Sequence, residues 1–151
     1  MYNMLVHAHS GLRWLVLIFL LLAIVTAWSN WSKKADYPAG KMPLLGLIFT
    51  HLQLLIGFAL YFMDGLGGQA KVRFGDMADT MGNTVLRFYT VEHITMMLIA
   101  IVLITMGYSK AKRQPEQARG HKTIFTFYLI GLILILAGIP WPFRIPGAGW
   151  F

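Results

Sequence analysis

The chain has 151 residues, of which 57% are hydrophobic and 13% are charged, with a net charge of +7 and a mean hydropathy of +0.60. A soluble domain carries about 25% charged residues, so this composition indicates an integral membrane protein. The absence of cysteine excludes disulfides, iron–sulfur ligation and thiol catalysis. The basic residues cluster in short segments between apolar runs, which is the membrane pattern, so no nucleic-acid partner is expected.

Four apolar runs are each long enough to cross a lipid bilayer, which takes about 20 residues of helix. They predict an all-α, integral membrane four-helix bundle with up-down connectivity, forming one domain over residues 1–151. In chain order, the expected spans cover approximately residues 10–30, 42–63, 84–108 and 122–139. The last span should end near Ile139, because the prolines at 140, 142 and 146 cannot continue a helix.

The connecting segments predict an orientation. Segments 29–43 and 109–122 lie on the same side of the expected bundle and contain most of the lysines and arginines. The positive-inside rule assigns such segments to the cytoplasm. We therefore expect a multi-pass protein of a bacterial inner membrane, with the N- and C-termini on the outer side.

Histidines within the spans are the main sign of a function. The chain has five, and His7, His9, His51 and His93 lie in or at the mouths of the first three spans, whereas His121 is expected to be solvated. Ionisable residues are costly in a membrane and mark candidate functional sites. At about 1.5 Å per residue from the inner ends, His51 lies about 13 Å above the inner edge, His93 about 22 Å and His9 about 31 Å.

The second span carries a stripe of small and polar residues that is typical of close helix contact in lipid. The stripe consists of Gly46, Gln53, Gly57 and Tyr61. His51 points away from it and should face another neighbour or a cavity.

The third span begins with the sequence RFYTVEH, which includes Arg87, Glu92 and His93. By the same measure Arg13 and Glu92 both lie about 25 Å above the inner edge, so we expect an ion pair between them. Arg87 should lie at the outer interface. His93 heads a stripe that leaves room for a neighbouring helix or a flat cofactor, with Met97, Ala100, Ile104 and Gly107.

Two histidines that project into a helical bundle are the ligands that b-type haem requires. His51 and His93 are the predicted pair of iron ligands, since both lie within spans, and His9 is the alternate ligand. Arg13 and Arg87 are predicted to hold the haem propionates or the Glu92 carboxylate. Because methionines accompany the histidines, a copper site is a less favoured alternative.

Four stretches of the chain resemble a known family. They are HSGLRW from His9, FTHLQLLIG from Phe49, LRFYTVEH from Leu86 and IPWPFR from Ile139. Over nearly its whole length the chain resembles small bacterial four-helix membrane proteins labelled cytochrome b, and more distantly b561-type cytochromes. The resemblance implies haem b and an electron-transfer role between the quinone pool and an outer-side partner or a respiratory complex.

Two other functions remain open from the sequence. The chain could be a non-catalytic subunit of a membrane complex, whose polar residues fix helix packing. It could also be a transporter-like protein that handles metal ions or protons, and such a small protomer would need to form a homo-oligomer. No nucleotide-binding glycine motif or nucleophile triad indicates other enzymatic chemistry.

Overall fold

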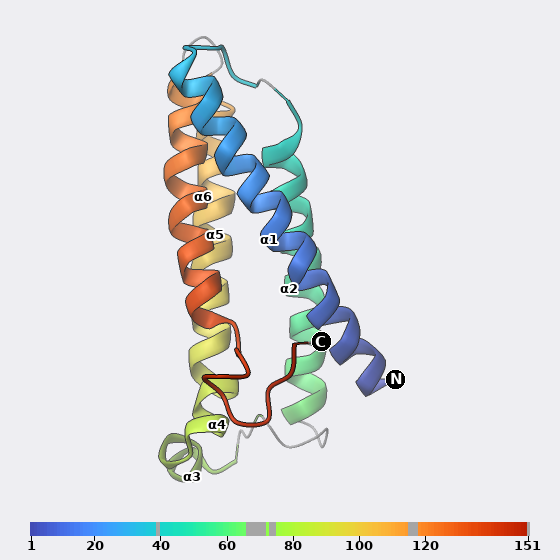
Figure 1. Cartoon of the computed structure of the whole chain (residues 1–151). Coiled ribbons are helices and arrows are strands. Elements are labelled where there is room, and N and C mark those ends of the chain that lie inside the picture. The colour runs from blue at the N-terminus through green and yellow to red at the C-terminus, as the bar shows by residue number, and fades with distance from the viewer. Residues whose placement is uncertain (39, 66–71, 73–74, 115–117, 151) are drawn as a thin grey trace.

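The computed structural model describes residues 1–38, 40–65, 72, 75–114 and 118–150, and it shows helices without β-strands in this part of the chain (Figure 1). The elements in order are α1 (Tyr2–Ser32), α2 (Met42–Gly65), α3 (Met77–Gly82), α4 (Thr84–Arg87), the π-helical turn η1 (Phe88–Glu92), α5 (His93–Ala111) and α6 (Arg119–Gly138).

Four helical stretches are long and apolar enough to cross a membrane. They are Tyr2–Ser32, Met42–Asp64, Thr84–Ala111 and Arg119–Gly138. The prediction of an all-helical chain with four long apolar helices is therefore confirmed. α6 ends at Gly138 and Ile139 is extended, as the prolines that follow predict.

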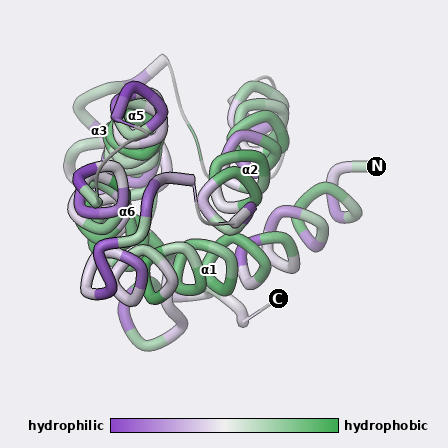
Figure 2. The backbone as a smooth tube through the Cα atoms, turned by 90° about the horizontal axis from the view of Figure 1, so that it is seen from above, coloured by the Kyte–Doolittle hydropathy of each residue, from purple (hydrophilic) through white to green (hydrophobic). Residues whose placement is uncertain are grey.

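The helices are arranged with α1 in the middle of one side of the bundle. α1 packs against α2 and α6, α6 packs against α5, and α2 meets α5 only lightly. Figure 2 shows α2 and α5 set apart from each other when the bundle is viewed from above. Figure 1 shows that α1 crosses the bundle obliquely and that the N- and C-termini lie toward the end that carries α3.

The contact between α5 and α6 depends on glycine. A Cβ atom on Gly131 would lie 2.7 Å from Cγ1 of Ile104, and one on Gly107 would collide with Cβ of Phe127. The predicted stripe below His93 thus faces a neighbouring helix. Since Ala100 and Ile104 are fully buried there, the lower part of the stripe has no room for a flat cofactor.

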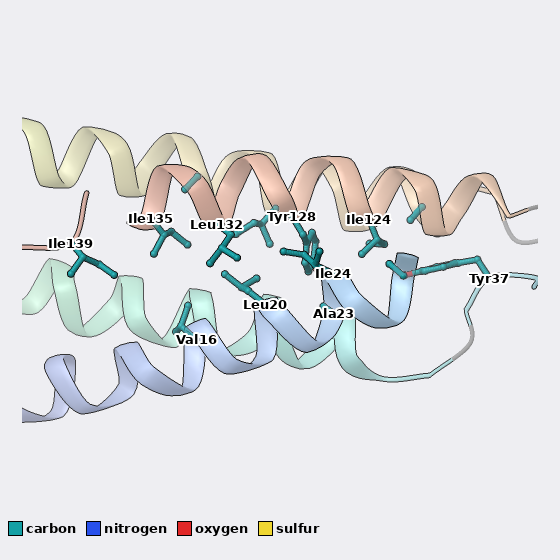
Figure 3. Close-up of a cluster of buried hydrophobic side chains, with 14 residues drawn as sticks. Val16, Leu20, Ala23, Ile24, Tyr37, Ile124, Tyr128, Leu132, Ile135 and Ile139 are labelled. Carbon is teal, nitrogen blue, oxygen red and sulfur yellow. The ribbon is translucent and has the colours of Figure 1, made fainter. Parts of the chain in front are cut away.

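The core lies between α1 and α6 and continues into the segment that follows α1 (Figure 3). Leu20, Ile124 and Tyr128 are fully buried in it. The Tyr128 hydroxyl donates a hydrogen bond of 2.7 Å to the carbonyl of Pro43, so the one polar atom of this ring has a partner.

The prediction that His121 is solvated is wrong. Its side chain is buried, its ring lies 5.2 Å from that of Tyr37, and its Nε2 donates to the carbonyl of Asp36 at 3.1 Å. The reason is that α6 already begins at Arg119, and the segment around Tyr37 folds over this first turn. A Cβ atom on Gly120 would lie 2.6 Å from Cβ of Tyr37, which shows how closely the two segments approach.

Candidate functional site

The structure brings His9 of α1 and His93 of α5 together. The centroids of the two imidazole rings are 6.3 Å apart and the ring planes are inclined by 72°. Both rings keep an intermediate accessible fraction although protein surrounds them on most sides. The two side chains therefore lie between the helices, with α2 beside His9 and α6 beside His93.

His93 is held in a defined orientation by α6. Its Nδ1 lies 2.7 Å from the carbonyl oxygen of Gly138. A carbonyl only accepts, so Nδ1 carries the hydrogen and a neutral ring keeps its lone pair on Nε2. The ring of Phe88 packs beside it, with centroids 6.0 Å apart. A hydrogen bond to a backbone carbonyl is one of the common ways in which a metal-ligating histidine is oriented.

His9 lies in a notch on α2. A Cβ atom on Gly57 would be 3.1 Å from Cε1 of His9, so a larger residue there would push the imidazole by a few tenths of an ångström. The side-chain amide of Gln53 donates to the backbone carbonyl of His9 at 2.8 Å. Nδ1 of His9 and Oε1 of Gln53 are both buried without a hydrogen-bond partner. The predicted close-contact stripe on α2 is confirmed, and it holds His9 in place.

Arg13 lies one helical turn after His9 and on the same face of α1. Its side chain is 8% exposed, and its Nη2 donates to the carbonyl of Trp150 at 2.5 Å. The guanidinium carbon lies 5.4 Å from the ring centroid of Trp14 and 6.0 Å from that of Trp141. Its buried Nε has no hydrogen-bond partner. Arg13 is therefore a buried cation with unused hydrogen-bonding capacity near the two histidines.

The predicted ion pair between Arg13 and Glu92 is wrong, because Glu92 pairs with Arg87 instead. Nε of Arg87 lies 2.7 Å from Oε1 of Glu92, and Arg87 also donates to the carbonyl of Met81. Residues five apart lie on different faces of an α-helix, but the π-helical turn between these two rotates them toward each other. Arg13 and Glu92 were expected at the same height above the inner edge of the membrane, but this did not place their side chains in contact.

His51 lies elsewhere in the bundle. Its Nδ1 is 2.8 Å from the carbonyl of Leu47, and its Nε2 is 3.4 Å from the hydroxyl of Thr105 on α5. Thr105 is just over three turns from His93, about 18 Å along the helix. The structure therefore does not bring His51 to His93. It confirms that His51 points away from the stripe on α2 and toward a different neighbour.

The arrangement of His9 and His93 fits a metal bound between two imidazoles. With ring centroids 6.3 Å apart, the two imidazoles are close enough to bind one metal ion together. Among the residues that the structure describes, no group of three or more His, Asp or Glu side chains forms a metal site. Two ligands suit haem, whose porphyrin supplies the other four nitrogens.

Comparisons with protein-family models, with curated proteins and with solved structures found no match for this chain. What the site can bind is therefore inferred from its own residues. The sequence identified His9 as the alternate ligand, and it did not identify Gly138, Gln53 or Trp150 as supports. The spacing of four residues between His9 and Arg13 was the one available signal that the two share a face.

Proposed function

We propose that this protein is a b-type cytochrome of a bacterial inner membrane, and that it binds haem between α1 and α5 through His9 and His93. It transfers electrons between the quinone pool and an outer-side partner or another subunit of a respiratory complex. The observation that carries the proposal is the pairing of the two rings at 6.3 Å, with Nδ1 of His93 already engaged by Gly138.

The surroundings of the two histidines support haem over a bare metal ion. The buried guanidinium of Arg13 provides a positive charge one turn from His9, where a propionate carboxylate would find a hydrogen-bond donor. Arg87 is already paired with Glu92, so Arg13 is the preferred partner of a propionate. Bound haem would supply one-electron redox chemistry at this position.

The residues of the chain have separate tasks in this proposal. His93 and His9 hold the iron, each through one ring nitrogen. Gly138 fixes the tautomer of His93, and Gly57 and Gln53 fix the position of His9. Together these contacts come from four helices, so the bundle orients both ligands before any group is bound.

The membrane assignment is part of the proposal. Four apolar helices have the required length, and the lysine- and arginine-rich segments lie at the end opposite α3. The positive-inside rule then places His9 and His93 in the outer half of the bilayer, with both termini outside. Electrons would leave or enter on that side.

Absorption spectra of the purified protein test the proposal directly. The protein should be produced with an adequate haem supply, and its spectrum recorded before and after reduction with dithionite. We expect a Soret band, sharp α and β bands on reduction, and about one haem per chain. A colourless protein that is correctly folded would exclude the proposal and favour the non-catalytic subunit.

A further inference from the structure

Gln53 carries an unused hydrogen-bond acceptor beside His9. Its side-chain nitrogen donates to the backbone carbonyl of His9 at 2.8 Å, and this bond fixes which end of the amide meets the backbone. The amide oxygen Oε1 points elsewhere, and it is buried without a hydrogen-bond partner among the described residues. Buried polar atoms are seldom left unpaired, because nothing then offsets the loss of their contact with water. The oxygen of Gln53 therefore calls for a donor.

The imidazole of His9 has an unpaired atom on the side that faces Gln53. Its Nδ1 is also buried without a partner in the described part of the chain. This nitrogen is turned toward α2, since it would lie 3.7 Å from a Cβ atom on Gly57, whereas Nε2 does not come within 4 Å of that position. Gly57 follows Gln53 by four residues, so both lie on the face of α2 that meets His9. Two unpaired buried atoms thus belong to two residues that are already in contact.

We propose that Gln53 is a positioning residue for His9, and that its Oε1 receives the hydrogen of Nδ1 through one water molecule between the two atoms. A water molecule accepts from Nδ1–H and donates to Oε1, so it pairs both. The hydrogen on Nδ1 leaves the lone pair of a neutral ring on Nε2, the nitrogen that is turned away from α2. The consequence of this tautomer for haem binding rests on the proposed function.

The two histidines then share one arrangement. His93 directs its Nδ1 hydrogen to the carbonyl of Gly138 on α6 at 2.7 Å, and His9 directs its own toward Gln53 on α2. Each ring keeps Nε2 as the nitrogen with a lone pair, which is the form in which a neutral imidazole binds a metal. A hydrogen bond at the other ring nitrogen makes the imidazole a stronger ligand, and its loss commonly costs about 10–100-fold in metal affinity.

The tautomer of His9 can be measured before any haem is added. In protein labelled with ¹⁵N-histidine in detergent micelles, protonated and unprotonated ring nitrogens have different chemical shifts, and His9→Gln identifies the signals of His9. At about pH 8, where a histidine ring is neutral, we expect the hydrogen on Nδ1. Gln53→Met, which keeps the length of the side chain without its polar atoms, should move the hydrogen toward Nε2. A wild-type His9 with its hydrogen on Nε2 would overturn the proposal.

Gln53→Glu separates positioning of the imidazole from a simple contact between α1 and α2. Glutamate keeps an oxygen acceptor but lacks the amide nitrogen that donates to the backbone of His9, so the hydrogen should stay on Nδ1. Tyr61→Phe is the matched control, because it removes a similar bond of 2.9 Å from α2 to the carbonyl of Thr90 and should leave the tautomer of His9 unchanged. If Gln53→Glu and Gln53→Met changed His9 alike, Gln53 would act only as a donor and the inference would be wrong.

Haem affinity provides a second measurement. In competition with apomyoglobin, Gln53→Met should bind haem at least about tenfold more weakly than the wild-type protein, whereas Gln53→Glu should stay close to it. A tautomer that shifts in Gln53→Met, in a protein that shows no Soret band, would exclude the haem proposal alone. A normal Soret band with an unchanged tautomer in Gln53→Met would exclude the role of Gln53 alone.

Discussion

Arg13 shows how this chain buries a charge close to its candidate site. The guanidinium has no carboxylate within ion-pair distance among the described residues, and it is stabilised by the Trp150 carbonyl and by the faces of Trp14 and Trp141. Cation–π contacts are worth about 0.5–2 kcal/mol each, and more where water is excluded. The C-terminal segment thereby closes over α1, so that Arg13 couples the position of the tail to the surroundings of His9.

Tyr37 gives a prediction on pH at the opposite end of the molecule. Burial raises the pKa of its hydroxyl to about 12. In the unfolded chain the hydroxyl loses its proton near pH 10. The contribution of the buried, neutral Tyr37 hydroxyl to the free energy of unfolding is therefore complete below pH 10 and is lost as the pH rises through 12. We expect the free energy of unfolding to fall by about 2 kcal/mol over this interval because of Tyr37.

The comparison with Tyr37→Phe isolates this effect from the other tyrosines. Unfolding should be measured for both proteins in detergent micelles between pH 7 and 12. The difference in unfolding temperature between the two proteins should change above pH 10, with the wild-type protein losing more stability. If the unfolding temperatures of the two proteins fell in parallel as the pH rose, the burial of Tyr37 would not be the cause of the loss of stability above pH 10.

Among the elements, the tight pairing of α5 and α6 sets the position of His93. Gly107, Gly131 and Gly138 let the two helices approach, and the carbonyl of Gly138 reaches the imidazole for this reason. The π-helical turn η1 directly before His93 also helps to set the position of this side chain. It changes the direction in which every later side chain leaves the helix axis.

Gly107→Ala tests the close packing of α5 on α6. The new methyl group would collide with Cβ of Phe127, which cannot move without its helix, so we expect a loss of about 1–3 kcal/mol in stability. Gly11→Ala is the matched control, because nothing lies within 4 Å of a Cβ atom there. That change should stabilise α1 by about 0.5–1 kcal/mol through helix propensity. Thermal unfolding of both variants in micelles should move in opposite directions, and equal shifts would contradict the described contact.

The apolar runs and the prolines after Ile139 were enough to predict the four long helices, because length and hydropathy are local properties. The stripe on α2 was also predictable, since small residues at helical spacing mark a close contact. Contacts between helices were not predictable in the same way. Heights counted along each helix ignore the oblique course of α1, which brings His9 to His93, and the π-turn, which brings Glu92 to Arg87.

On the scale of the whole molecule, three pairs of neighbouring helices pack closely, namely α1 with α2, α1 with α6 and α5 with α6. The fourth pair, α2 and α5, is only in light contact. The pair of histidines lies toward the end with the termini, because His9 is near the start of α1 and His93 is the first residue of α5. If the orientation that we propose holds, the two histidines lie in the outer half of the bilayer. A redox partner would then approach the histidine pair from the outer side.

The absence of cysteine makes this orientation straightforward to measure. Cysteine can be placed at Ala78 in α3 or at Gln114 after α5, both of which are exposed. A maleimide that does not cross membranes should label Ala78→Cys in intact spheroplasts and should label Gln114→Cys only after lysis. The reverse pattern would contradict the orientation.

The most direct test of the haem proposal is rescue of a ligand variant by free imidazole. In His9→Gly the low-spin spectrum of a haem with two histidine ligands should disappear, and added imidazole should restore it by filling the vacated position. His93→Ala should lose haem, whereas His7→Ala should keep the wild-type spectrum. Binding of haem through His9 would be contradicted if His9→Gly kept an unchanged low-spin spectrum while His51→Ala lost it, because the pair would then be His51 and His93.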